Sequence, residues 1–125
     1  MPVKNKLNKQ EISNYHESYD NTLKCLENSK HKLEELNENF DIDEDDFHHN
    51  ETKIGVLDQK IAIVESKKIA FDANQQSVNP PSTQQLDSLK ALIARVERLN
   101  ANQAVATEIV NLSTDVFTAF NNIHN

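Results

Sequence analysis

Apolar residues recur at helical spacing in three long stretches of the chain, residues 8–40, 43–77 and 83–122. In the first stretch, one heptad position is filled by Ile12, Tyr19, Leu26, Leu33 and Phe40. The second stretch repeats this pattern with Lys68 as a charged interruption, and the third has apolar positions on more than one face. Such periodicity predicts three long helices whose apolar seams pack against one another.

Each predicted helix starts with a similar capping pattern. A capping box places Ser, Thr, Asp or Asn just before the first turn and an acid or amide three residues later. Three pairs fit this layout: Asn8 with Glu11, Asp43 with Asp46, and Ser82 with Gln85. Because the residue before a proline is driven out of the helical region, Pro80 and Pro81 predict that the second helix ends in a turn at residues 78–82.

Composition favours the same class of fold. The 125 residues include one glycine, three prolines and no tryptophan, which argues against a fold with many tight turns or strands. We therefore expect a single all-α domain over residues 1–125, an elongated antiparallel three-helix bundle with coiled-coil-like packing. It would consist of a long helical hairpin and a third helix. The glycine, Gly55, falls inside the second helix, where we expect it to allow a close helix crossing.

Acidic residues are concentrated in one segment, DIDEDDFHHNE at residues 41–51. This segment holds six of the 20 acidic residues and no lysine or arginine. Glu44, Asp45 and Asp46 fall in the expected first turn of the second helix, where unpaired N–H groups and the helix dipole favour negative charge. We interpret the segment mainly as a helix start. A charged handle for a basic partner is an alternative.

A metal site is a further alternative for this segment. An EF-hand loop that starts at Asp41 would need glycine at its sixth position and glutamate at its twelfth, where the chain has Asp46 and Thr52. Neighbouring histidines on a helix point about 100° apart, so His48 and His49 would need ligands from elsewhere to bind one ion. Divalent metal binding is therefore a minor alternative, and we expect no cofactor.

Charge and cysteine usage restrict the other partners. Outside residues 41–51 the charges nearly balance, so we expect no basic face for nucleic acid or for an anionic membrane. No stretch is apolar for long enough to span a bilayer. A single cysteine, Cys25, and no signal-peptide pattern predict a cytoplasmic protein, although export without a cleaved signal stays open. We expect Cys25 to be a core residue.

No phosphate loop, nucleophile with a base, or paired carboxylates in a concave site is visible, so we expect no enzyme and no small-molecule ligand. The pattern favours a helical protein–protein interaction module, such as an adaptor, inhibitor or chaperone-like protein. Its expected partner surface on the third helix is Val105, Ile109, Leu112, Val116, Phe117 and Phe120. Glu44, Asp45 and Asp46 form a second expected contact. Alternatively, a complete core covers the apolar positions of the third helix.

Self-assembly is the alternative function, with a second copy of the chain as partner in a homodimer or in a structural or secretion-apparatus-type subunit. The segment from Pro80 onward, which includes NANQAVATEIVNLSTDVF, resembles the C-terminal helix of type III secretion needle subunits. The likeness covers about a third of the chain. Those subunits are much shorter and have no counterpart of the first helix, so we do not assign the chain to that family.

Overall fold

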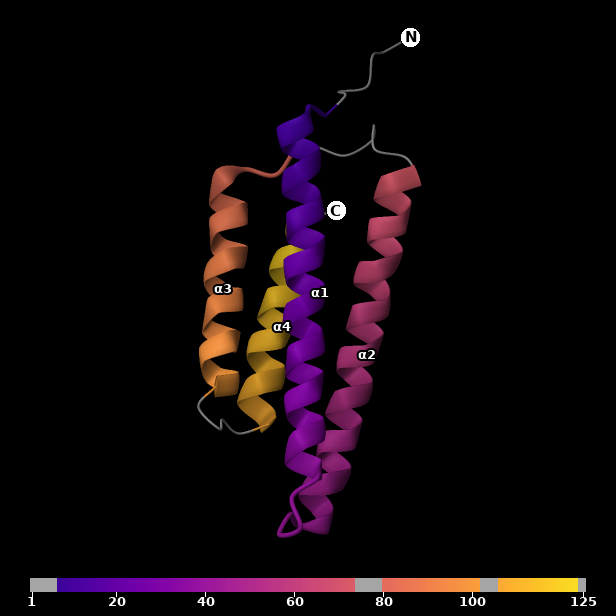
Figure 1. Cartoon of the computed structure of the whole chain (residues 1–125), viewed down its shortest axis with the longest axis vertical. Coiled ribbons are helices and arrows are strands. Elements are labelled where there is room, and N and C mark those ends of the chain that lie inside the picture. Colours follow the sequence, from indigo (N-terminus) through magenta and orange to yellow (C-terminus); the bar gives the residue numbers. More distant parts are fainter. Residues whose placement is uncertain (1–6, 74–79, 102–105, 124–125) are drawn as a thin grey trace.

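Within residues 7–73, 80–101 and 106–123, which are those that the computed structural model describes, the chain forms four helices and no strand. The helices are α1 (Lys9–Asn37), α2 (Glu44–Ala73), α3 (Thr83–Ala101) and α4 (Ala106–Ile123) (Figure 1). The prediction of an all-α protein is therefore confirmed. None of these helices combines the length and the apolar character that crossing a bilayer requires.

The prediction of three helices is wrong, because the third predicted helix corresponds to two. α3 and α4 run in opposite directions and pack against each other (Figure 1). Val105 and half of the NANQ segment, Asn102 and Gln103, lie outside the described residues. The physical reason is that this segment supplies no apolar side chain to a seam, and asparagine is a poor helix former. Two antiparallel helices can bury apolar faces that one straight helix would leave in water.

Two of the three capping boxes predicted from the sequence are formed, and the third start, at Asp43, has a cap without the predicted reciprocal pair with Asp46. The Asn8 Oδ1 atom accepts a hydrogen bond from the Glu11 N–H at 2.8 Å, and the Asn8 N–H donates to the Glu11 Oε1 atom at 2.9 Å. Ser82 and Gln85 make the same reciprocal pair at 3.1 and 2.9 Å. At the start of α2, the Asp43 carboxylate accepts from the Asp45 N–H at 3.2 Å. These contacts fix where α1, α2 and α3 begin.

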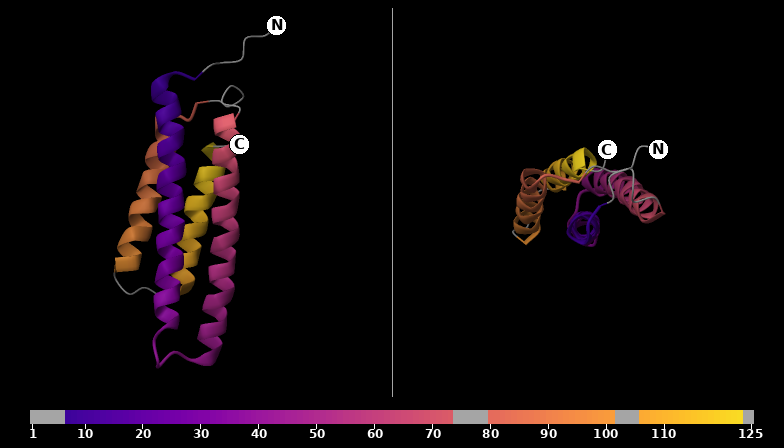
Figure 2. Two further views of the ribbon diagram at one scale, coloured as in Figure 1. Left: turned by 45° about the vertical axis from the view of Figure 1, so that its right-hand side comes forward. Right: turned by 90° about the horizontal axis from the view of Figure 1, so that it is seen from above.

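The helices form a curved layer with one helix on its inner side. Seen from above, α3, α4 and α2 follow one another in an arc, and α1 lies across the concave side of this arc (Figure 2). α1 contacts each of the other three helices, whereas α2 and α3 do not touch each other. Among the four described helices, contact between the two ends of the arc is therefore made only through α1 and α4.

Aromatic side chains fill the core where α1, α2 and α4 meet. The Tyr15 and Phe71 rings are 4.7 Å apart between centroids, and the Tyr19 and Phe120 rings are 5.2 Å apart. The Tyr19 hydroxyl donates to the Lys67 carbonyl oxygen at 3.0 Å, which ties α1 to α2. Phe71 also packs on Tyr19, so the rings form one continuous cluster.

Polar residues within the apolar seam of α1 are used in packing. The buried Ser29 hydroxyl lies 2.9 Å from the Ser113 hydroxyl of α4 and 3.4 Å from the Asn100 amide of α3, so one small residue joins three helices. The expectation for Gly55 is wrong. It is exposed, and no atom lies within 4 Å of where a Cβ atom would be placed, so it permits no close crossing.

The two helix pairs differ in length, so at one end of the molecule α1 and α2 are the only helices among the described residues. α1 and α2 have 29 and 30 residues, whereas α3 and α4 have 19 and 18. At 1.5 Å per residue, the first pair is about 15 Å longer than the second. The end of the α1–α2 hairpin therefore extends beyond the α3–α4 pair (Figures 1 and 2). We call residues 36–50 at this end the distal tip.

Substitution of two phenylalanines should separate the core from the distal tip. Phe120 is fully buried, whereas Phe40 is fully exposed. We expect Phe120→Ala to lower the free energy of unfolding by about 3–5 kcal/mol, because it leaves a cavity among packed rings. Phe40→Ala should change it by less than about 0.5 kcal/mol. Urea unfolding followed by circular dichroism measures both, and equal losses would contradict the assigned core.

Candidate functional site: the distal tip

Asparagine side chains hold the turn of the distal tip in one conformation. The Asn37 amide donates to the Phe47 carbonyl oxygen at 3.3 Å, and the Asn50 amide donates to the Asn37 Oδ1 atom at 2.9 Å. Within the turn, the Asn39 side chain accepts from the Asp41 N–H at 3.0 Å. These bonds join the end of α1 to the start of α2. The side chains of the turn are therefore carried on a fixed backbone.

Phe40 projects from this turn without burial. Its relative exposure is 103%, the highest among the large hydrophobic residues that are exposed. The sequence pattern placed Phe40 in the seam of a first helix ending near residue 40, and that placement is wrong, because α1 ends at Asn37. Ile42 and Phe47, in contrast, are half-buried. Phe40 thus contributes nothing to the core and offers its whole ring to solvent.

Carboxylates surround Phe40 along the chain. Every acid of residues 41–51 is exposed: Asp41, Asp43, Glu44, Asp45, Asp46 and Glu51. Glu44, Asp45 and Asp46 occupy the first turn of α2, as the interpretation of this segment as a helix start requires. The His48 imidazole lies 3.8 Å from Glu44 and 3.4 Å from Glu51, and among the described residues no lysine or arginine forms an ion pair with these six acids. The distal tip therefore combines an exposed aromatic ring with unneutralised negative charge.

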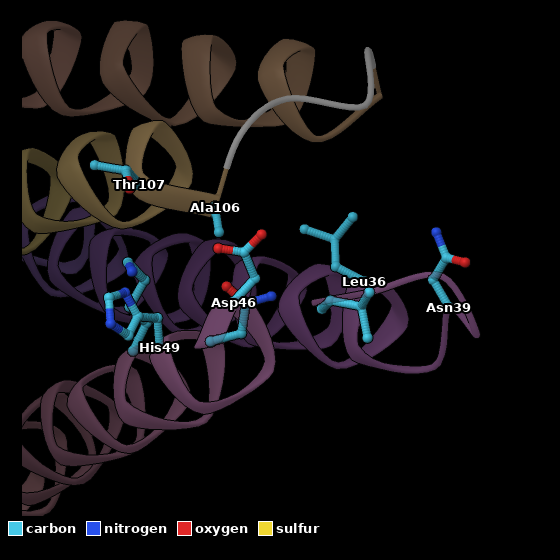
Figure 3. Close-up of a pocket in the computed structure, with 9 residues that line it drawn as sticks. Leu36, Asn39, Asp46, His49, Ala106 and Thr107 are labelled. Atoms are coloured by element: carbon cyan, nitrogen blue, oxygen red, sulfur yellow. The ribbon is translucent and has the colours of Figure 1, made fainter. Parts of the chain in front are cut away.

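A shallow groove of about 310 Å³ lies beside the turn, between the end of α1 and the starts of α2 and α4. Leu36 and Ile42 supply its apolar wall, and Asp46 and His49 project into it from α2, opposite Ala106 of α4 (Figure 3). The volume is at the lower end of the range for small-molecule sites. Its mixed lining suits the edge of a protein contact better than a buried substrate.

The distal tip does not assemble reactive groups. Among the described residues, no three His, Cys, Asp or Glu side chains converge in a way that could hold a metal ion. The single cysteine, Cys25, lies in the core, away from the tip, and is 1% exposed. Desolvation by burial, with a smaller contribution from Glu97, raises the pKa of its thiol to about 12. Cys25 is therefore a core residue and a weak nucleophile.

The apolar residues predicted to bind a partner are used within the molecule. Ile109, Val116 and Phe120 are fully buried, and Leu112 and Phe117 are half-buried against the core. The remaining one, Val105, lies outside the described residues. A partner could reach the buried three only if α4 left its place. Of the two surfaces predicted to bind a partner, the apolar one is therefore largely buried within the molecule, and the acidic one at the distal tip is exposed.

Sequence reasoning placed the negative charge at the distal tip but missed Phe40. The heptad pattern assigned this residue to the seam, because periodicity alone does not report where a helix ends. Its neighbours, Asn39 and Asp41, were the contrary signal. Asparagine and aspartate compete for backbone hydrogen bonds and favour turns over helix interiors, so these two neighbours favour a turn at Phe40 over a place in the seam.

Labelling of Cys25 should report unfolding. Because burial holds the thiol neutral, we expect an aromatic disulfide reagent to modify the native protein at least about a hundredfold more slowly than the urea-unfolded chain. The usual thiol pKa of 9.0 rises to about 12 in the folded state. The stabilising effect of the neutral thiol is thus complete below pH 9 and is lost between pH 9 and 12. Rapid native labelling at neutral pH would contradict the assigned burial.

Addition of metal should not stabilise the protein. Since the described residues offer no set of three converging ligands, we expect the melting temperature to stay constant with micromolar zinc or millimolar calcium. Differential scanning fluorimetry of chelator-treated protein is the measurement, and the double variant His48→Ala/His49→Ala is the control. A saturable rise in melting temperature that this variant abolishes would show that residues 41–51 bind metal.

Comparisons with protein-family models, with curated protein sequences and with solved structures found no match to this chain. Its function therefore has to be inferred from the chemistry of its own surfaces.

Proposed function

We propose that the protein is a non-enzymatic helical interaction module that binds a protein partner through its distal tip. The observation that carries this proposal is Phe40, a fully exposed aromatic ring at the end of a protruding hairpin. Exposing such a ring to water is unfavourable, and large aromatic residues are enriched among those that dominate binding energy at interfaces. A ring that does not contribute to folding is free to contribute to binding.

The charges around Phe40 define the chemistry of the partner. A complementary surface would have an apolar depression for the ring and lysine or arginine side chains around it. Carboxylates such as Asp43, Glu44 and Asp45 would then increase the association rate by attraction over about one Debye length, roughly 8–10 Å near physiological salt. Binding should therefore weaken as salt concentration rises.

The rigidity of the distal tip supports the same proposal. Side-chain bonds from Asn37, Asn39 and Asn50 fix the turn, so little conformational entropy is lost when a partner binds. Because the α1–α2 hairpin extends beyond α3 and α4, the tip is accessible from several sides. In this proposal the buried face of α4, with Ile109, Val116 and Phe120, stabilises the fold without meeting the partner.

Affinity capture with matched variants tests the proposal. Wild-type protein and the variants Phe40→Ser and Ile69→Ser would be immobilised and incubated with extract of the native host at low salt. Ile69 is the control because it is also an exposed large apolar residue, at 70%, but lies on α2 away from the tip. We expect a protein that binds the wild type and Ile69→Ser, is reduced at least about tenfold on Phe40→Ser, and elutes near 0.5 M salt.

Two results would overturn the proposal. Identical protein sets on all three baits would show that Phe40 is not a binding residue. Capture that is lost with both serine variants would indicate general hydrophobic adsorption. Circular dichroism of each bait establishes that a loss of binding does not come from unfolding.

A further inference from the structure

A strip of basic and apolar side chains runs along the side of α2 next to α4. Val56, Lys60, Ile63 and Lys67 follow at four-, three- and four-residue spacing, which places them on one face of the helix. The Lys60 ammonium group lies 5.1 Å from the centre of the Phe117 ring, so this face adjoins α4. Ile63 is 44% exposed, and Val56 and Phe117 are half-buried. We call these five residues the lysine strip.

The positive charge of the lysine strip is not neutralised within the chain. Among the described residues, neither Lys60 nor Lys67 forms an ion pair, whereas Lys30 of α1 pairs with Asp58 at 2.7 Å. Asp58 and Glu65, the acids of this part of α2, are seven residues apart and share the face that pairs with α1. The strip is thus a local basic surface on a chain of net negative charge.

The acids of α4 also point away from the lysine strip. Glu108 and Asp115 each stand two residues before an apolar residue of the side next to α2, Val110 and Phe117 respectively. Two residues correspond to a rotation of about 200° around a helix, so both carboxylates lie on the opposite side of α4. An anionic ligand that approaches the strip meets no repulsion from this helix.

We propose that the lysine strip of one copy binds the distal tip of a second copy. The tip has a fully exposed ring, Phe40, among exposed carboxylates, and the strip has an exposed apolar residue, Ile63, between two unpaired ammonium groups. Each surface supplies what the other lacks. This inference rests on the proposed function, because it names the partner of the tip as a second copy of the chain.

The two surfaces cannot meet within one molecule. Val56, the first residue of the strip, lies 12 residues after Glu44 on the continuous helix α2, a separation of roughly 18 Å along a rigid rod. The asparagine side-chain hydrogen bonds in the turn prevent the tip from folding back onto α2. Contact is therefore possible only between copies, and a tip-to-strip contact joins two different surfaces. Such a heterologous contact leaves one free tip and one free strip, so association continues into chains.

Molar mass in solution tests the inference first. Light scattering coupled to size-exclusion chromatography should show a mass that rises above the monomer mass of 14.2 kDa over a hundredfold range of protein concentration at low salt. Near 0.5 M salt, where the Debye length is only about 4 Å, the mass should return to that of the monomer. A wild-type chain that stays monomeric at low salt overturns the inference.

Two variants and their mixture identify the contact. Phe40→Ala disables the tip, and Lys60→Glu/Lys67→Glu disables the strip, so each variant alone should be monomeric. Mixed in equal amounts, they should form a species of twice the monomer mass and nothing larger, because only one tip and one strip remain functional in each pair. The control Lys9→Glu/Lys24→Glu makes the same charge change elsewhere on the surface and should associate like the wild type.

The outcomes of the mixing experiment decide between contacts. Association of both variants alone, or failure of the mixture to form the pair, overturns the tip-to-strip contact. Should charge reversal unfold the protein, Lys60→Gln/Lys67→Gln replaces it and should weaken association at least about tenfold. A monomeric wild type that still captures a host protein through Phe40 would overturn only the choice of a second copy. Absence of any Phe40 dependence in both experiments would overturn the proposed function as well.

Discussion

The buried face of α1 is the constraint on which the rest of the structure depends. It is wide, since it contacts α2, α3 and α4, and it mixes sizes accordingly: Tyr19 packs against rings of both α2 and α4, whereas the small Ser29 meets Ser113 of α4. Ser29 illustrates the requirement, because only a small side chain lets Ser113 and Asn100 approach at once. A larger apolar residue there would separate the helices. α2 and α3 do not contact each other, so their relative positions are set by how each of them packs against α1 and α4.

Structural features that depend on residues close in sequence were predictable from the sequence, and features that depend on packing between helices were not. Asn8 and Ser82 cap their helices as expected, because capping is decided within four residues. The division of the third predicted helix into α3 and α4 depends on which helices its apolar faces pack against. A short stretch of sequence does not contain this information. Lys68 shows an intermediate case: the sequence marked it as a charged interruption of the second apolar pattern, but its ion-pair partner, Asp20 at 3.0 Å, lies on another helix.

The same distinction holds for the two proposed binding surfaces, of which only one was predictable from the sequence. The acidic segment is contiguous in the sequence, so its charge could be located before the structure was known. The lysine strip is contiguous only in space, because it needs the register of α2 and the position of Phe117 on α4. A nearly balanced composition outside residues 41–51 indicated no basic face, since an average hides how charges are distributed around a helix. Phe40 was assigned to the core because its heptad position extends past the end of α1.

The difference in length between the two helix pairs has a consequence for how this architecture can vary. Where the hairpin extends beyond α3 and α4, inserting one heptad into each of α1 and α2 would move the turn outward by about 10 Å, while the residues of α1 and α2 that face α3 and α4 keep their identity. The reach of the hairpin is therefore adjustable independently of the four-helix core. Chains with this architecture could present the same turn at different distances from an unchanged four-helix core.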